Sequence, residues 1–540
     1  MAATVAGERA GAVSRTQPAA RLLPLLVALL LLLLGGLYFA ARRPTLPFDD
    51  PAEYVVSAVS LAQGQGYRVP AYPADPPNTF VPPGYSLLLA ALFKLQPGFP
   101  ANLALMELVS LVGFYALLAL SAVILRRRFG ASPAEITLAL LLVATTPLAI
   151  SLSTAIMSDT LFAVLALGSV LLVGTSWERP GRAGLLLLLA GGLLAAGAYY
   201  TRLAGIAVVA AVGLDALRRA RHAAWWRVAL GLLPAALLVP WIAWVSLNGG
   251  SGYTRHWASS IPGSAPGMEG PRTFLLGLIG NAVQGDGVLY TVAPPLSDVW
   301  PLSAAIFVYV VWQSWRGWWR DGEVTHLYLL FYLLVLLPVA VLVSGRYVWP
   351  VAPLLAWHVV SGLRRGWGLV SARLGRPRLR ADWLVVGTLL LTNVVGLGVT
   401  ATRVVTSGWT VDEYYRDELA ALLQTADYLR TLDPPTAAIG TNNWSTLPWW
   451  YLYTGRRGID AVARTDGADG WWVPRARQGD PEAISYFIYH RDNGRPGDDT
   501  DDRSAVEAAL RARGASTTPL YCTADRSVCI YDWRRRAPAP

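Results

Sequence analysis

Two segments near the start of the chain decide the fold: residues 22–41, LLPLLVALLLLLLGGLYFAA, and residues 48–67, FDDPAEYVVSAVSLAQGQGY. The first contains no charged residue and is about long enough to cross a hydrocarbon core of roughly 30 Å. A cleaved signal peptide is the alternative, because Arg9, Arg15 and Arg21 precede the segment and small residues end it. The length of this apolar run, and the many comparable runs that follow, favour a transmembrane span.

The composition is typical of a protein embedded in a bilayer. Hydrophobic residues make up 54% of the 540 residues and charged residues only 15%, and the charges lie between apolar runs. The formal net charge of +10 does not indicate nucleic-acid binding. Most of the arginines lie in short loops, where they act as topology signals.

Arginine-rich and arginine-poor loops alternate along the chain, which predicts about eleven transmembrane helices in an all-α polytopic domain, residues 22–402. The strongest cytoplasmic signal is the segment 364–380, which contains six arginines. An odd number of spans places the N-terminal tail, residues 1–21, in the cytoplasm and the C-terminus outside. Long outer loops are predicted at 42–100 and 248–300. The spans are predicted at 22–41, 102–125, 134–151, 158–175, 183–199, 203–217, 228–247, 301–315, 325–343, 347–362 and 383–401.

From residue 403 to residue 540 the hydropathy falls, and the pattern predicts a small extracytoplasmic α/β domain. Segments 417–432 and 503–514 are typical of amphipathic helices, and segments 436–440 and 484–490 are typical of strands. Cys522 and Cys529 flank a short turn that would set them opposite each other on a hairpin. A disulfide is favoured in an oxidising compartment, with two unpaired thiols as the alternative.

The tail also contains the sequence WSTLPWWY, residues 444–451. Its tryptophans, Trp444, Trp449 and Trp450, are interpreted mainly as part of an interfacial aromatic belt. A platform on which a sugar stacks is the alternative.

The first outer loop begins with two adjacent carboxylates, Asp49 and Asp50, and continues as a predicted amphipathic helix over 51–63 on the bilayer surface. Capping is one interpretation of Asp50, because aspartate is a favoured N-cap and Pro51 a favoured first helical residue. Catalysis is the other, because a carboxylate that is partly desolvated at a bilayer edge becomes a better general base. A Pro-Pro-Gly turn at 82–84 then leads into an apolar stretch too short to span, which predicts a second interfacial helix.

Several motifs follow one another in a characteristic order. They are Asp50, Tyr54, Ala58, Leu61, Gly64, Gly66 and Tyr67; Pro82 to Tyr85; Ser158, Asp159, Leu161 and Phe162; Arg202 and Gly205; and Arg346, Tyr347, Pro350 and Pro353. In this order they resemble the polyprenyl-phosphate-dependent glycosyltransferases with the GT-C fold, such as lipid A aminoarabinose transferases and protein O-mannosyltransferases. Two positions depart from the family pattern, since Val81 replaces a common arginine and Asp159 replaces a glutamate. The resemblance covers roughly residues 20–402 and not the tail.

The resemblance implies that the chain is an enzyme, an inverting glycosyltransferase of the cytoplasmic membrane. A sugar would move from a polyprenyl-phosphate carrier to a lipid, glycan or protein acceptor at the outer face. Asp50 is then the base that deprotonates the acceptor hydroxyl, and Asp49 is the second candidate.

The leaving phosphate needs positive charge at the outer membrane edge, where arginine gives bidentate hydrogen bonds. Arg202 and Arg346 are the best-placed candidates, although snorkelling to the interface is an alternative explanation for both. Arg255 and His256 in the large outer loop are weaker candidates. Asp159 would orient an arginine or cap its helix. The motif tyrosines Tyr54, Tyr85 and Tyr347 are predicted to contact or orient the substrate.

The five histidines are scattered and form no cluster with cysteine, so no protein-built zinc site is predicted. No cofactor is expected, although a divalent cation at Asp49 and Asp50 is left open. Two rival functions exist. A transporter or flippase of lipid-linked saccharides would be expected to have inverted repeats and polar residues at the bilayer midplane. An O-antigen ligase or polymerase shares the large outer loop but not this acidic first loop.

Overall fold

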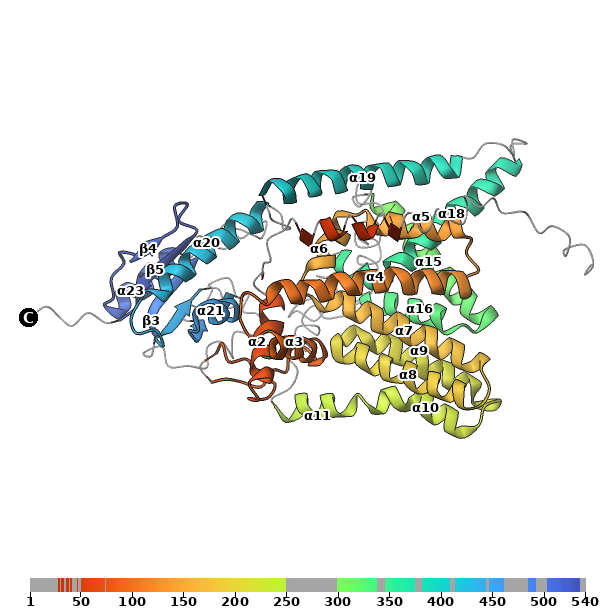
Figure 1. Ribbon diagram of the computed structural model, residues 1–540, viewed down its shortest axis with the longest axis horizontal. Helices are drawn as coiled ribbons and strands as arrows, with labels where there is room; N and C mark the ends of the chain where they lie inside the picture. Colours follow the sequence, from red (N-terminus) through yellow and green to blue (C-terminus); the bar gives the residue numbers. More distant parts are fainter. Residues whose placement is uncertain are drawn as a thin grey trace, which may run out of the picture.

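The computed structural model describes residues 28–40 in part, residue 46, and residues 50–72, 74–248, 299–337, 345–373, 381–407, 413–442, 446–460, 484–491 and 503–534. A body of helices carries a smaller α/β part at one end (Figure 1). The helices of the body are α4 (Leu103–Arg127), α5 (Pro133–Ala144), α6 (Pro147–Thr154), α7 (Ser158–Glu178), α8 (Gly181–Thr201), α9 (Ile206–Arg218), α10 (Trp225–Ala236), α11 (Val239–Leu247), α15 (Trp300–Asp321), α16 (Val324–Leu336), α17 (Gly345–Val348), α18 (Ala352–Arg373) and α19 (Ala381–Ser407). Short 3₁₀ turns η1 (Leu203–Gly205), η2 (Arg219–Arg221) and η4 (Trp349–Val351) join some of them.

Four helices of the described chain are long and apolar enough to cross a bilayer. They are α4, α7, α8 and the combined stretch Trp225–Leu247 formed by α10 and α11. The described residues between 28 and 40 are also helical, and Tyr115 of α4 donates a hydrogen bond to the carbonyl of Leu31 at 3.0 Å. Two further predicted spans correspond to α9 and α16, which have 13 residues each within the described part of the chain. The count of eleven spans therefore stays a prediction.

The span predicted at 134–151 is broken into two helices, α5 and α6, that meet at 73°. Thr146 begins the second helix by accepting a hydrogen bond from the amide of Ala149 at 3.2 Å, and Pro147 follows as the first helical residue. Proline has no N–H to continue the first helix, so the chain turns here. The hydropathy of the sequence did not predict this break.

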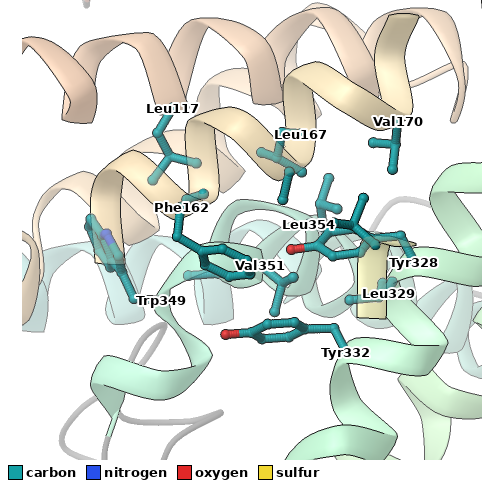
Figure 2. Packing of buried hydrophobic residues seen from close by; sticks show 14 of the residues in the cluster. Leu117, Phe162, Leu167, Val170, Tyr328, Leu329, Tyr332, Trp349, Val351 and Leu354 are labelled. Carbon is teal, nitrogen blue, oxygen red and sulfur yellow. The ribbon is translucent and has the colours of Figure 1, made fainter. Parts of the chain in front are cut away.

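Aromatic and branched side chains fill the space between α4, α7, α16 and η4 (Figure 2). Phe114 of α4 stacks on Trp349 with ring centroids 5.8 Å apart, and the rings of Phe162 and Tyr332 stack with their centroids 5.7 Å apart. Inside a bilayer such close packing acts through van der Waals contact rather than through removal of water. It fixes the ends of α7 and η4, which carry or adjoin the candidate site.

The segment predicted to be the first outer loop contains two helices, α2 (Asp50–Ala62) and α3 (Gly84–Leu95). The first segment is helical, as predicted, but its polar face does not point into solvent, because Glu53, Ser57 and Ser60 are all buried. The amide of Asn78 donates to Glu53 Oε1 at 3.1 Å and to Ser57 Oγ at 2.9 Å. The polar face of α2 is therefore satisfied inside the protein.

The tail folds around a five-stranded sheet of order β2-β1-β3-β5-β4. Its strands are β1 (Ala438–Thr441), β2 (Gly458–Asp460), β3 (Ile484–His490), β4 (Tyr521–Cys522) and β5 (Val528–Asp532), and its helices are α20 (Glu413–Arg430), α21 (Leu447–Thr454) and α23 (Arg503–Arg513). The strand β1 is parallel to β2 and β3, and β5 is antiparallel to β3 and β4. Cys522 and Cys529 pair across β4 and β5 and form a disulfide with an S–S distance of 2.09 Å.

Trp449 and Trp450 are fully buried in α21. They are neither part of an exposed interfacial belt nor a platform for a sugar, so both interpretations of these two residues were wrong. The reason is tertiary, because α21 packs against α2 of the first outer loop, and both helices share one hydrophobic core.

Candidate active site

Four charged side chains, alternately acidic and basic, contact one another at the end of the bundle that carries the tail. Arg346 Nη2 is 2.6 Å from Asp50 Oδ2, and Arg346 Nε is 3.3 Å from Asp159 Oδ2. Arg202 Nη1 is 2.9 Å from the same oxygen of Asp159. Two carboxylates and two guanidinium groups therefore alternate in space, although they are far apart in sequence.

Asp159 is the centre of this arrangement, and its side chain is only 1% exposed. A buried carboxylate is costly unless it is paired, and here two guanidinium groups contact one of its oxygens. The other oxygen, Oδ1, has no hydrogen-bond partner among the described residues. It is an unsatisfied hydrogen-bond acceptor within the charged cluster.

The charge of Arg346 is maintained by its neighbours. Burial disfavours the cation, but the carboxylates of Asp159 and Asp50 outweigh burial and raise the pKa of Arg346. The guanidinium has five N–H groups, and it contacts the two carboxylates through Nε and Nη2. Its side chain is 25% exposed, so an anion can reach it.

Tyrosines surround the charged groups. The ring of Tyr347 lies 5.4 Å from the guanidinium carbon of Arg202 and 5.5 Å from that of Arg346. Both distances fall within the range of cation–π attraction. The rings of Tyr54 and Tyr85 meet edge to face with centroids 5.0 Å apart. Burial raises the pKa of both phenols, so each stays neutral and can donate a hydrogen bond.

Ser158 connects the outer loop to the bundle. Its hydroxyl accepts a hydrogen bond from Arg202 Nη1 at 3.1 Å and lies 2.9 Å from the hydroxyl of Tyr54. Ser158 is the first residue of α7, directly before Asp159. Ser158 belongs to the motif that also contains Asp159, but the sequence analysis did not predict it as a site residue.

Close backbone contacts bring these elements together. A Cβ atom on Gly84 would lie 2.7 Å from the carbonyl oxygen of Tyr200, so only glycine lets α3 approach the end of α8. Arg202 follows α8 in an extended conformation, with φ −150° and ψ 139°. Val81 is one of the two positions that differ from the family pattern. Its backbone carbonyl accepts a hydrogen bond from the hydroxyl of Tyr67 at 2.8 Å, and this contact does not depend on the side chain of residue 81.

Seven of the predicted site residues lie in this one region: Asp50, Tyr54, Tyr85, Asp159, Arg202, Arg346 and Tyr347. Asp49, Arg255 and His256 lie outside the described residues.

Sequence reasoning missed Tyr332, whose hydroxyl donates to the carbonyl of Tyr347 at 2.7 Å and so fixes α17 against α16. No motif marks Tyr332, because it reads as one apolar residue in a span. Within the described residues no group of three or more His, Cys, Asp or Glu side chains is placed to hold a metal ion.

The fold and this site define a class: a multi-pass membrane protein with an acid–arginine centre at one end of its helices. No protein-family model matches the sequence, and no curated protein matches it. Solved structures do match. ArnT from Cupriavidus metallidurans bound to undecaprenyl phosphate has a TM-score of 0.55 and 15% identity, covering 95% of this chain and 98% of that one.

The Archaeoglobus fulgidus oligosaccharyltransferase gives a second match. Its complex with Zn and sulfate has a TM-score of 0.52 and 10% identity, covering 93% of this chain and 73% of that one. The same enzyme tethered to an acceptor peptide has a TM-score of 0.50 and 10% identity, covering 95% and 74%. These likenesses confirm the predicted GT-C fold.

Proposed function

We propose that this protein is an inverting glycosyltransferase that moves a sugar from a polyprenyl-phosphate carrier to an acceptor hydroxyl at the outer face of the cytoplasmic membrane. The observation that carries the proposal is the connected series Asp50–Arg346–Asp159–Arg202, in which the candidate base contacts one of two arginines that Asp159 holds together. The ArnT structure of the same fold holds undecaprenyl phosphate, and the oligosaccharyltransferase holds an acceptor peptide. Both support a lipid-phosphate donor and a separate acceptor.

In the proposed reaction, Asp50 takes the proton of the acceptor hydroxyl. The acceptor oxygen attacks the anomeric carbon from the side opposite the phosphate, so configuration inverts. The bond between that carbon and the phosphate oxygen breaks, and its electron pair leaves on the phosphate. Arg346 and Arg202 stabilise the charge that develops there.

The ion pair between Asp50 and Arg346 gives the donor a second role. A donor phosphate at Arg346 competes with Asp50 for the guanidinium. Donor binding therefore releases the carboxylate toward the acceptor, and Asp159 keeps Arg346 in place through Nε.

A divalent cation at Asp50 would share the carboxylate with Arg346, whose Nη2 lies 2.6 Å from one of its two oxygens. The arginines supply the positive charge at the phosphate in this proposal.

The first test measures sugar transfer in membranes supplied with a panel of labelled polyprenyl-phosphate sugars. Asp50→Asn should lower turnover by about 10²- to 10⁴-fold at equal expression, as expected for a lost general base. The exposed tail variant Asp427→Asn is the matched control and should retain full activity. Full activity of Asp50→Asn would remove Asp50 as the base. A labelled carrier that crosses the membrane without losing its sugar would favour a flippase instead.

A further inference from the structure

The C-terminal domain contacts the first outer loop on both sides of α2. On one side, the indole N–H of Trp449 donates to the carbonyl oxygen of Leu46 at 2.8 Å, a residue shortly before Asp50. On the other side, the backbone N–H of Gly458 donates to the carbonyl of Ala71 at 2.9 Å. The tail therefore holds the chain both before and after the helix that begins at Asp50.

Packing supports these two hydrogen bonds. Side chains of α2, α3, α20, α21 and three tail strands belong to one continuous hydrophobic cluster. The ring of Tyr453 in α21 stacks on Trp449 at 4.1 Å and meets Phe99, which precedes α4, edge to face at 4.9 Å. In Figure 1 α21 lies beside α2 at the junction of the tail and the bundle.

This arrangement matters because the two partners of the central ion pair come from different parts of the chain. Arg346 belongs to α17 of the bundle, whereas Asp50 begins α2 of the outer loop. Their separation depends on how α2 is held, and a displacement of about 1 Å at a reacting group can cost on the order of 10²-fold in rate.

We infer that the C-terminal domain is a positioning element for the outer loop, and that Trp449 acts through Leu46 to hold the start of α2. The tail is therefore part of the structure that positions the site. The inference rests on the proposed function only for its catalytic consequence, because the contact itself is independent of substrate.

Two adjacent tryptophans provide a matched pair of variants. Trp449 and Trp450 are both fully buried in α21, but Trp450 donates its indole N–H to Thr446 Oγ1 within the tail at 3.0 Å. Trp449→Phe and Trp450→Phe remove similar volumes and one hydrogen bond each. Only the first removes a bond to the outer loop.

The experiment is amide hydrogen exchange on the full-length purified protein. In Trp449→Phe, amides of residues 50–62 should exchange about 2- to 10-fold faster, as expected for one lost hydrogen bond, while the tail strands keep their protection. In Trp450→Phe, residues 50–62 should exchange as in the native chain. Equal exchange of α2 in both variants would overturn the inference.

A second variant covers the case in which Trp449→Phe loosens the tail itself, which would appear as lost protection in β3 and β5. Phe99→Leu removes a docking contact without changing the sequence of the tail. It should speed exchange in α2 by about twofold while the sheet stays protected. Unchanged exchange in α2 would then count against the inference.

Kinetics separates this inference from the proposed function. With a donor that is consumed, Trp449→Phe should lower kcat at least about tenfold and leave KM within about twofold, because Asp50 is displaced and the arginines are not. A rise in KM alone would assign the tail to substrate binding. If no donor is consumed, the proposed function is in question but the exchange result still decides the role of the tail.

Discussion

At the scale of single residues, Asp159 is the centre of the candidate site. The carboxylate is buried and holds two arginines at once, which is a geometry that suits the planar guanidinium. The motif positions indicated which residue types gather here. They did not indicate that Asp50 and Asp159 would share one arginine, because positions 50, 159 and 346 meet only through the packing of three different elements.

Arg346→Lys tests this geometry. An ammonium group lacks the planar fork of the guanidinium, so the lysine cannot stay on Asp159 through one N–H group while another contacts Asp50 or the phosphate that replaces it. We expect the affinity for undecaprenyl phosphate to fall about 10- to 100-fold, measured by titration of the purified protein, since charge-assisted hydrogen bonds are lost. Arg364→Lys, at an arginine paired with Glu135 elsewhere in the bundle, is the control and should bind normally. Normal binding by Arg346→Lys would remove it from the phosphate site.

At the scale of elements, breaks and close approaches place the site. The end of α8 lies against the start of α3 because Gly84 has no Cβ, and Thr146 with Pro147 turns the chain between α5 and α6. The Pro-Pro-Gly turn was recognised from the sequence as the start of a short helix. The contact between Gly84 and the carbonyl of Tyr200 was not predicted, because the sequence does not show which backbone atoms approach a glycine.

Gly84→Ala should separate α3 from α8. The added methyl group would lie 2.7 Å from a backbone oxygen, which cannot move aside as a flexible side chain can. We expect the free energy of unfolding to fall by about 1–3 kcal/mol, measured by denaturation in detergent. Gly98→Ala is the control, because nothing lies within 4 Å of a Cβ at that position. Equal stability of the two variants would contradict the close approach.

At the scale of the whole molecule, the orientation of the chain in the membrane is a prediction from the sequence. The arginine pattern predicts that the tail lies outside the cytoplasm and that the loop after α15 lies inside it. The two cysteines of the chain are joined in a disulfide, so a new cysteine can be labelled on its own.

Asp427 and Trp319 are suitable sites for such cysteines, since their side chains are 75% and 74% exposed. Asp427→Cys should react with a membrane-impermeant maleimide in intact spheroplasts, whereas Trp319→Cys should react only after permeabilisation. The reverse pattern would invert the topology and place the site in the cytoplasm. The native chain serves as the unlabelled control.

The sequence by itself determined the membrane class, the order of the elements and the residue types of the site. Apolar runs, arginine-rich loops and motif spacing are local or additive features, so they can be read along the chain. Tertiary structure decided which oxygens and nitrogens meet, that α2 is buried, and that Trp449 faces Leu46 across two domains. These outcomes depend on contacts between residues hundreds of positions apart, and only packing selects among the many contacts that the same composition allows.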